Sequence, residues 1–150
     1  MEADWLLRLE RARDMETIEE LRACNLLSAA YGLALTEAGM RELAAQRSQA
    51  LERAGRVEFG GGILSSLIAV FCDSPYLTRE NYLETLMELQ ESFYYFKTEA
   101  MERFSDDELL ALMKGYFDGV CQGSLEYLTG TTLEELCRAA RNGGFGGEAW

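Results

Sequence analysis

The most informative chemical fact about this chain is a residue that it lacks, because none of its 150 residues is histidine. Histidine is the commonest general base in enzymes and the commonest protein ligand of transition metals. Serine–histidine triads, cysteine–histidine dyads and histidine-ligated zinc or di-iron sites are therefore excluded. The sequence indicates no cofactor and no metal, and any catalysis would have to use carboxylates, lysine, tyrosine or cysteine.

A run of three glycines, Gly60 to Gly62, precedes an apolar segment that is predicted to be helical. Glycine amides and a helix N-terminus can together bind an anion. The run lacks the GxxxxGK[ST] order of a phosphate loop and the preceding strand of a dinucleotide-binding motif. Two interpretations remain: an anion or ligand site that includes Gly61, or a flexible turn that lets helices approach closely.

A thiol, a carboxylate and a phenol are grouped at the expected end of the next helix, as Cys72, Asp73 and Tyr76. Polar groups on loops are often functional. A neighbouring carboxylate and a helix C-terminus both raise the pKa of a thiol, so the pattern disfavours Cys72 as a nucleophile. A redox or metal-sensing role shared by Cys72 and Cys121 is a further alternative.

Arg47 lies among the apolar residues of a helix face that should point inward. Its guanidinium group must either extend along the surface to water or pair with a carboxylate. The carboxylates that could pair with it are Glu58, Asp73 and Asp118. In such a site the arginine could instead bind the carboxylate or phosphate of a ligand.

An aromatic run from Phe93 to Phe96 is followed by Lys97. At helical spacing such residues either belong to the core or line a pocket for a planar or cationic ligand. Tyr95 and Lys97 are the members that the core does not require. With the residues above, they define a candidate ligand pocket that comprises Arg47, Glu58, Gly61, Cys72, Asp73, Tyr76, Tyr95, Lys97 and Cys121.

Four glutamates, Glu80, Glu84, Glu88 and Glu91, follow one another at spacings of four, four and three. This spacing places them on one face of a helix, where like charges mildly destabilise it. The stripe is either a solvated face or a docking surface for a basic partner. It could also form half of a carboxylate metal site, although no histidine completes the usual di-iron pattern.

The elements that must position these residues are all predicted to be helices, because apolar residues recur at helical spacing and only one proline occurs. We expect a compact single-domain bundle of six or seven helices around a long central helix, the longest of the chain. Thr36 is the expected N-cap of one helix, and Ser105 with Glu108 forms the capping box of another. The expected helices span about residues 15–31, 36–55, 63–73, 79–103, 105–117 and 131–141, with a short helical turn within 119–130.

Composition favours a cytoplasmic protein. The four cysteines are dispersed and are read as free thiols, and no secretory signal or transmembrane segment is recognisable. The net charge of −12 argues against nucleic-acid and membrane partners. It either serves only to keep the protein soluble, or it attracts a basic protein partner or mimics the charge of nucleic acid. The oligomeric state is left open.

The chain divides into three parts. Residues 1–14 form a charged amino-terminal arm, residues 15–141 form the helical domain, and residues 142–150 form a glycine-rich tail that is expected to be mobile. The tail contains Phe145 and Trp150, to which the sequence assigns no role.

Five strings of the chain stand out: YGLALT (31–36), GRVEFGGGI (55–63), FCDSPY (71–76), FYYFK (93–97) and CQGSLEY (121–127). Together they resemble a family of uncharacterised proteins from Firmicutes, mostly clostridia. The resemblance covers about residues 15–140 and implies a bacterial cytoplasmic protein. The family is a domain of unknown function, so it implies no reaction, cofactor or binding residue.

The sequence alone does not define a function, but it favours a small non-enzymatic adaptor or regulatory module that binds another protein through its acidic face. The absence of histidine and of any recognisable catalytic motif supports this interpretation. The alternative is a small-ligand-binding or enzymatic helical domain with an anion-accepting pocket near Glu58, Asp73 and Tyr95.

Overall fold

The computed structural model describes residues 2–58, 60, 62–100 and 103–142, with side chains described from residue 15 onward. Within these residues the backbone forms only helices, turns and bends, which confirms the all-α prediction. The elements are α1 (Glu2–Ser28), η1 (Ala29–Tyr31), α2 (Glu37–Ala54), α3 (Gly62–Phe71), α4 (Tyr82–Glu99), α5 (Asp106–Asp118), α6 (Leu125–Tyr127), η2 (Leu128–Thr132) and α7 (Leu133–Arg141).

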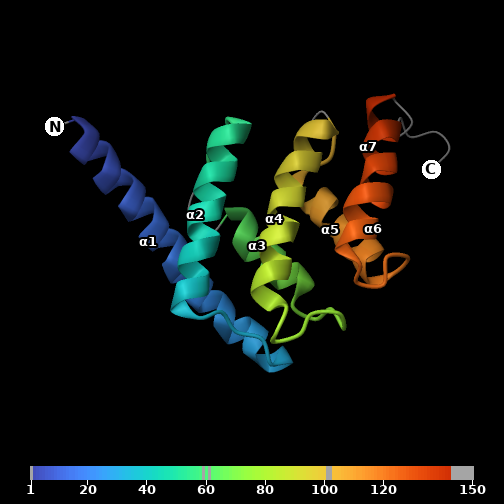
Figure 1. Cartoon of the computed structure of the whole chain (residues 1–150), viewed down its shortest axis with the longest axis horizontal. Helices are drawn as coiled ribbons and strands as arrows, with labels where there is room; N and C mark the ends of the chain where they lie inside the picture. The colour runs from blue at the N-terminus through green and yellow to red at the C-terminus, as the bar shows by residue number, and fades with distance from the viewer. Residues whose placement is uncertain (1, 59, 61, 101–102, 143–150) are drawn as a thin grey trace.

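Helix α4 is the central element of the bundle. It packs against α2, α3, α5 and α7, and Figure 1 shows α2, α4 and α7 standing side by side. On its inward side, the residues at alternating spacings of four and three are all buried, as the sequence predicts. These residues are Tyr82, Leu86, Leu89, Phe93, Phe96 and Ala100.

Helix α4 is shorter than predicted, because it spans 18 residues from Tyr82 to Glu99. Before it, Thr78 and Asn81 exchange hydrogen bonds between backbone and side chain, which forms a separate turn. The prediction that this helix is the longest is wrong, since α1 has 27 residues. Residues 2–14 contain no glycine or proline, so nothing in the local sequence stops α1 from extending back to Glu2.

Helix α3 lies deep in the fold, in contact with α1, α4 and α5. Its apolar residues Ile63, Leu64, Leu67, Ile68 and Phe71 are all buried. Burial of side chains of this size stabilises the fold by about 1.5–3 kcal/mol each. The helix therefore serves as a fixed platform for the residues at its two ends.

The predicted helix caps are present. The Thr36 hydroxyl accepts a hydrogen bond from the Gly39 amide, and Ser105 and Glu108 form a reciprocal capping box. Each cap satisfies backbone amides that the first turn of a helix leaves unpaired. The starts of α2 and α5 are thus determined locally.

Residues 2–14 of the predicted arm form the N-terminal half of α1, which diverges from α2 in Figure 1. The division of the chain at residue 14 stays a prediction. Most of the predicted tail, including Phe145 and Trp150, lies outside the described residues.

Candidate functional site

A groove of about 930 Å³ runs over the outward face of α4, between α2 and α7. Ala50, Arg53 and Ala54 of α2 line one side of it. The other side is lined by Thr129 and Gly130 of η2 and by Glu134 of α7, whereas α4 forms the floor. A groove of this volume has room for a segment of another polypeptide.

The polar lining of the groove is mainly acidic. Glu88, Glu91 and Glu134 make no ion pair within the described part of the chain, and Glu99 is bound by Arg141 at 3.1 Å. Arg53 is the one basic residue among the described lining residues. These unpaired carboxylates would attract a positively charged segment.

An exposed tyrosine lies on the floor among these carboxylates. Tyr95 is 54% exposed, and its ring meets the ring of Phe96 edge-on, with 4.9 Å between the ring centroids. Glu91 and Glu99 lie one helical turn before and after it on α4. An exposed aromatic face flanked by carboxylates suits a guanidinium or ammonium group.

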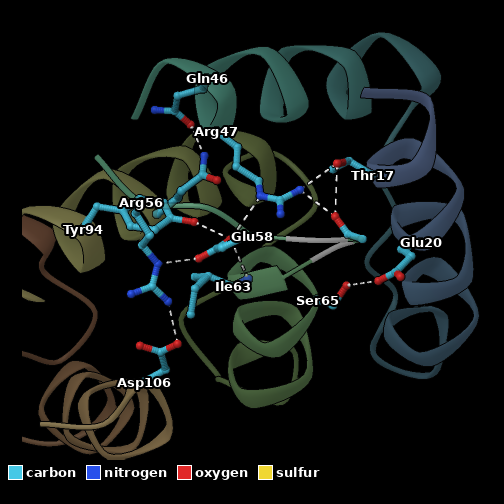
Figure 2. A network of polar contacts seen from close by, with 12 residues as sticks. Thr17, Glu20, Gln46, Arg47, Arg56, Glu58, Ile63, Ser65, Tyr94 and Asp106 are labelled. Atoms are coloured by element: carbon cyan, nitrogen blue, oxygen red, sulfur yellow. Dashed lines mark hydrogen bonds and ion pairs between the residues drawn. The ribbon is translucent and has the colours of Figure 1, made fainter. Parts of the chain in front are cut away.

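A buried ion pair, drawn in Figure 2, lies outside the groove lining. Arg47 Nε lies 3.1 Å from Glu58 Oε1, and the two side chains are only 5% and 6% exposed. A terminal nitrogen of Arg47 also donates to the Thr17 hydroxyl and to the Gly60 carbonyl, each at 2.6 Å. Of the two alternatives for Arg47, the structure therefore shows the pairing with Glu58.

Arg56 extends this network toward α5. Its Nε donates to Glu58 Oε2 at 2.9 Å, and its NH2 nitrogen lies 2.6 Å from Asp106 Oδ2. Lys97 binds the other oxygen of Asp106 at 3.1 Å. Partial burial disfavours the charge of Asp106, but the hydrogen bonds from Arg56 and Lys97 outweigh it and hold the pKa of this carboxyl below its usual value.

Tyr94 joins the network from α4, and its hydroxyl donates to Glu58 Oε1 at 2.8 Å. Burial, reinforced by the charge of Glu58, raises the pKa of Tyr94 well above its usual value. Tyr94 is thus a hydrogen-bond donor at physiological pH, and it also lines the groove.

A family model matches residues 20–145, which include the groove and the Arg47–Glu58 pair. The chain belongs to DUF6323. This is a family of unknown function, so the resemblance to an uncharacterised family is confirmed and no activity comes with it. Neither the search of curated proteins nor that of solved structures finds a match.

The described residues of this DUF6323 chain contain neither a candidate metal cluster nor a candidate membrane span. No group of three or more cysteine, aspartate or glutamate residues there is arranged to hold a metal ion. In the same residues, no helix combines the length and apolar character needed to cross a bilayer.

The structure places the candidate pocket residues in three separate regions. Arg47, Glu58 and Lys97 belong to the buried network, while Tyr95 lies in the groove. Cys72, Asp73, Tyr76 and Cys121 lie toward the C-terminal end of α3. Because Glu58 precedes this ten-residue helix and Cys72 follows it, the two ends are separated by about 15 Å. Gly61 is outside the described residues.

The groups near the C-terminal end of α3 are engaged in packing and pairing. Burial, with a smaller effect from Asp73, raises the pKa of the Cys72 thiol, in agreement with the expected lack of reactivity. Asp73 pairs with Lys114 at 2.8 Å, and the Tyr76 ring meets that of Phe117 edge-on. Cys121 Sγ lies 3.4 Å from the Thr132 hydroxyl.

Within the acidic stripe, all four glutamates are exposed, but only Glu88 and Glu91 line the groove. Sequence reasoning missed Gly130 and Glu134, which come from a part of the chain about 40 residues away from this stripe. It also missed Arg56 as a network residue. The available signal was that Arg56 lies only two residues before Glu58 in the sequence, close enough for the two charges to pair.

Proposed function

We propose that this chain is a non-enzymatic interaction module that binds a basic segment of another protein in the groove over α4. The observation that carries the proposal is the set of unpaired carboxylates Glu88, Glu91 and Glu134 around the exposed ring of Tyr95. Arginine or lysine side chains would pair with the carboxylates and stack on the ring. The net charge of −12 would accelerate the encounter with such a partner.

The shape of the groove supports the same occupant. Ala50 and Ala54 give α2 a low apolar edge, and Gly130 leaves open space where a side chain would begin. Gly130 belongs to η2, which is a π-helical segment, and such segments are frequent at functional sites. A helix or an extended strand of the partner could therefore approach the floor closely.

The setting that we propose is the bacterial cytoplasm, in a Firmicutes host. The cysteines Cys24, Cys72, Cys121 and Cys137 are unbridged, which is usual for a protein kept in a reducing compartment. The net charge of −12 also disfavours nucleic acid as a partner, because a negatively charged protein repels the phosphate backbone.

A steric test uses Gly130→Trp to fill the groove and Gly115→Trp as its matched control. Both glycines are helical, and neither has an atom within 4 Å of an added Cβ, but Gly115 lies on α5 away from the groove. The tagged variants would be used to capture partners from the native host. We expect a captured protein to be lost with Gly130→Trp and retained with Gly115→Trp.

A charge test complements it. Glu88→Lys/Glu91→Lys should abolish capture of the same protein, whereas Glu42→Lys/Glu52→Lys changes the charge equally at exposed positions of α2 outside the groove lining. Circular dichroism would establish that both double variants are folded. Equal capture by the two double variants would contradict the proposed groove.

A further inference from the structure

The carboxylate of Glu58 is bound as completely as a ligand would be. Its Oε1 accepts hydrogen bonds from Arg47 Nε at 3.1 Å, from the Ile63 amide at 3.2 Å and from the Tyr94 hydroxyl at 2.8 Å. Its Oε2 accepts one from Arg56 Nε at 2.9 Å. Figure 2 shows these donors converging on Glu58 from different parts of the fold.

Most of these donors are held in place independently of Glu58. Arg47, Ile63 and Tyr94 belong to α2, α3 and α4, which pack into the core. Arg56 is held separately by Asp106 and lies over the rings of Phe93 and Tyr94. An acceptor that left this position would leave a preformed set of donors behind.

The position also has the shape of an anion site. The Ile63 amide lies in the first turn of α3, where backbone amides and the helix dipole favour negative charge. Gly62 makes the close approach possible, because a Cβ at this position would overlap the Glu58 carboxylate and lie 2.8 Å from a terminal nitrogen of Arg47. A helix start, a glycine and two guanidinium groups therefore form one cradle.

The acceptor itself comes from the connection between α2 and α3. Gly55 and Gly60 in this connection have φ values of +63° and +59°, a conformation that glycine adopts easily. Val57, next to Glu58, is 70% exposed, so its side chain adds little buried apolar surface. Polar contacts therefore attach this segment to the core: the Glu58 carboxylate, and the Gly60 carbonyl, which accepts hydrogen bonds from Arg47 and Thr17.

We propose that this cradle is a carboxylate-binding site that the chain closes with its own Glu58, and that a small organic carboxylate displaces Glu58 and accepts the same hydrogen bonds. The ligand must be anionic, because it takes the place of the Glu58 carboxylate that pairs with the buried Arg47. Without an anion there, the arginine charge would be buried without a partner. The inference is independent of the groove and of its proposed partner.

The first test removes the internal acceptor and supplies an external one. Thermal unfolding of Glu58→Ala would be followed in increasing acetate, with chloride at equal ionic strength as the control. We expect acetate, but not chloride, to raise the Tm of Glu58→Ala progressively, because a ligand that binds only the folded state stabilises it by mass action. The double variant Arg47→Met/Glu58→Ala should lose this response.

The second test uses the wild-type protein and does not depend on the folding of any variant. Hydrogen–deuterium exchange would be measured with and without saturating acetate. Displacement of Glu58 should speed exchange at Val57 and Glu58, between the anchored Arg56 and Gly60, and leave α5 unchanged. The proposal is overturned if acetate acts no better than chloride on Glu58→Ala, if the Arg47 double variant responds equally, or if exchange in the wild-type segment is unaffected.

Discussion

Arg47 illustrates what burial demands of a single residue. Its side chain is only 5% exposed, so its charge has lost most of its contact with water. The cost of this desolvation is offset because Glu58, Thr17 and Gly60 accept hydrogen bonds from the guanidinium group. Its interaction with Glu58 is therefore strong when both partners are present, and removing one partner leaves a charge that is costly to bury. The network thus stabilises the junction of α1, α2 and α3 only as a complete unit.

We expect Arg47→Met to lower the free energy of unfolding by about 3–5 kcal/mol, because it leaves the Glu58 carboxylate buried without its α2 partner. Arg53→Met, an exposed change on the same helix, should lie within about 0.5 kcal/mol of wild type. Urea denaturation measures both values. Similar losses in the two variants would show that the buried pair has no special role.

Tyr94 and Tyr95 are neighbours with different roles, so they provide a matched pair. Tyr94→Phe removes a hydrogen bond to a buried charge and should cost about 1.5–3 kcal/mol, whereas Tyr95→Phe changes an exposed ring and should cost almost nothing. Chemical denaturation at neutral pH tests this difference.

The same pair predicts a pH effect. The pKa of Tyr94 is raised above its ordinary value of 10.0, so the stability that its protonated form provides is complete below that pH and is lost as the pH rises further. The stability difference between wild type and Tyr94→Phe should therefore shrink above about pH 10. A difference that stays constant across this range would contradict the assignment.

At the scale of the element, the start of α3 determines the geometry of the cradle. Gly62 has φ +49°, and the Glu58 carboxylate lies where a side chain at this position would begin. Both the backbone conformation and the space therefore require glycine here. Gly115 in α5 has open space and carries no such requirement.

We expect Gly62→Ala to lower the free energy of unfolding by at least about 1–2 kcal/mol, from the left-handed backbone alone. Gly115→Ala should raise it by about 0.5–1 kcal/mol, because alanine is the better helix former. Thermal and urea unfolding of the two variants give the comparison. A stabilising Gly62→Ala would show that Glu58 does not need to lie against α3.

At the scale of the whole molecule, charge is strongly unbalanced. The net charge of −12 is distributed over a chain of 150 residues, and mutual repulsion of this kind destabilises a compact state. The Arg47–Glu58 pair is shielded from dissolved ions, because its side chains are only 5% and 6% exposed, whereas the exposed glutamates are in contact with them. Salt should therefore affect the two differently.

We expect the Tm of the wild-type protein to rise as sodium chloride is increased from about 0.01 M to about 0.2 M, where the Debye length falls to less than about 10 Å. The stability difference between wild type and Arg47→Met should change little over the same range, because a buried pair is weakly screened. Differential scanning calorimetry records both. A Tm that falls with salt would contradict net repulsion as the dominant surface effect.

Local sequence was sufficient to predict the fold class, the caps of α2 and α5 and the buried face of α4. Apolar spacing, a capping hydroxyl or a capping box acts within one or two helical turns, so a single chain reveals it. The same local logic failed at the two ends of α4 and at the start of α1. The exchanged hydrogen bonds of Thr78 and Asn81 form a turn that sets the start of α4, and no helix breaker before Met15 stops α1 from extending back to Glu2.

The sequence by itself thus determined the helical class, the caps of α2 and α5 and the buried face of α4, and it contains no histidine. Only the tertiary structure decided that Arg47 pairs with Glu58, that Cys72 lies at the opposite end of α3, and that Glu134 joins Glu88 in one groove. The physical reason is distance along the chain. Helical periodicity records what lies three or four residues away, whereas these sites depend on how α2, α4 and α7 pack side by side.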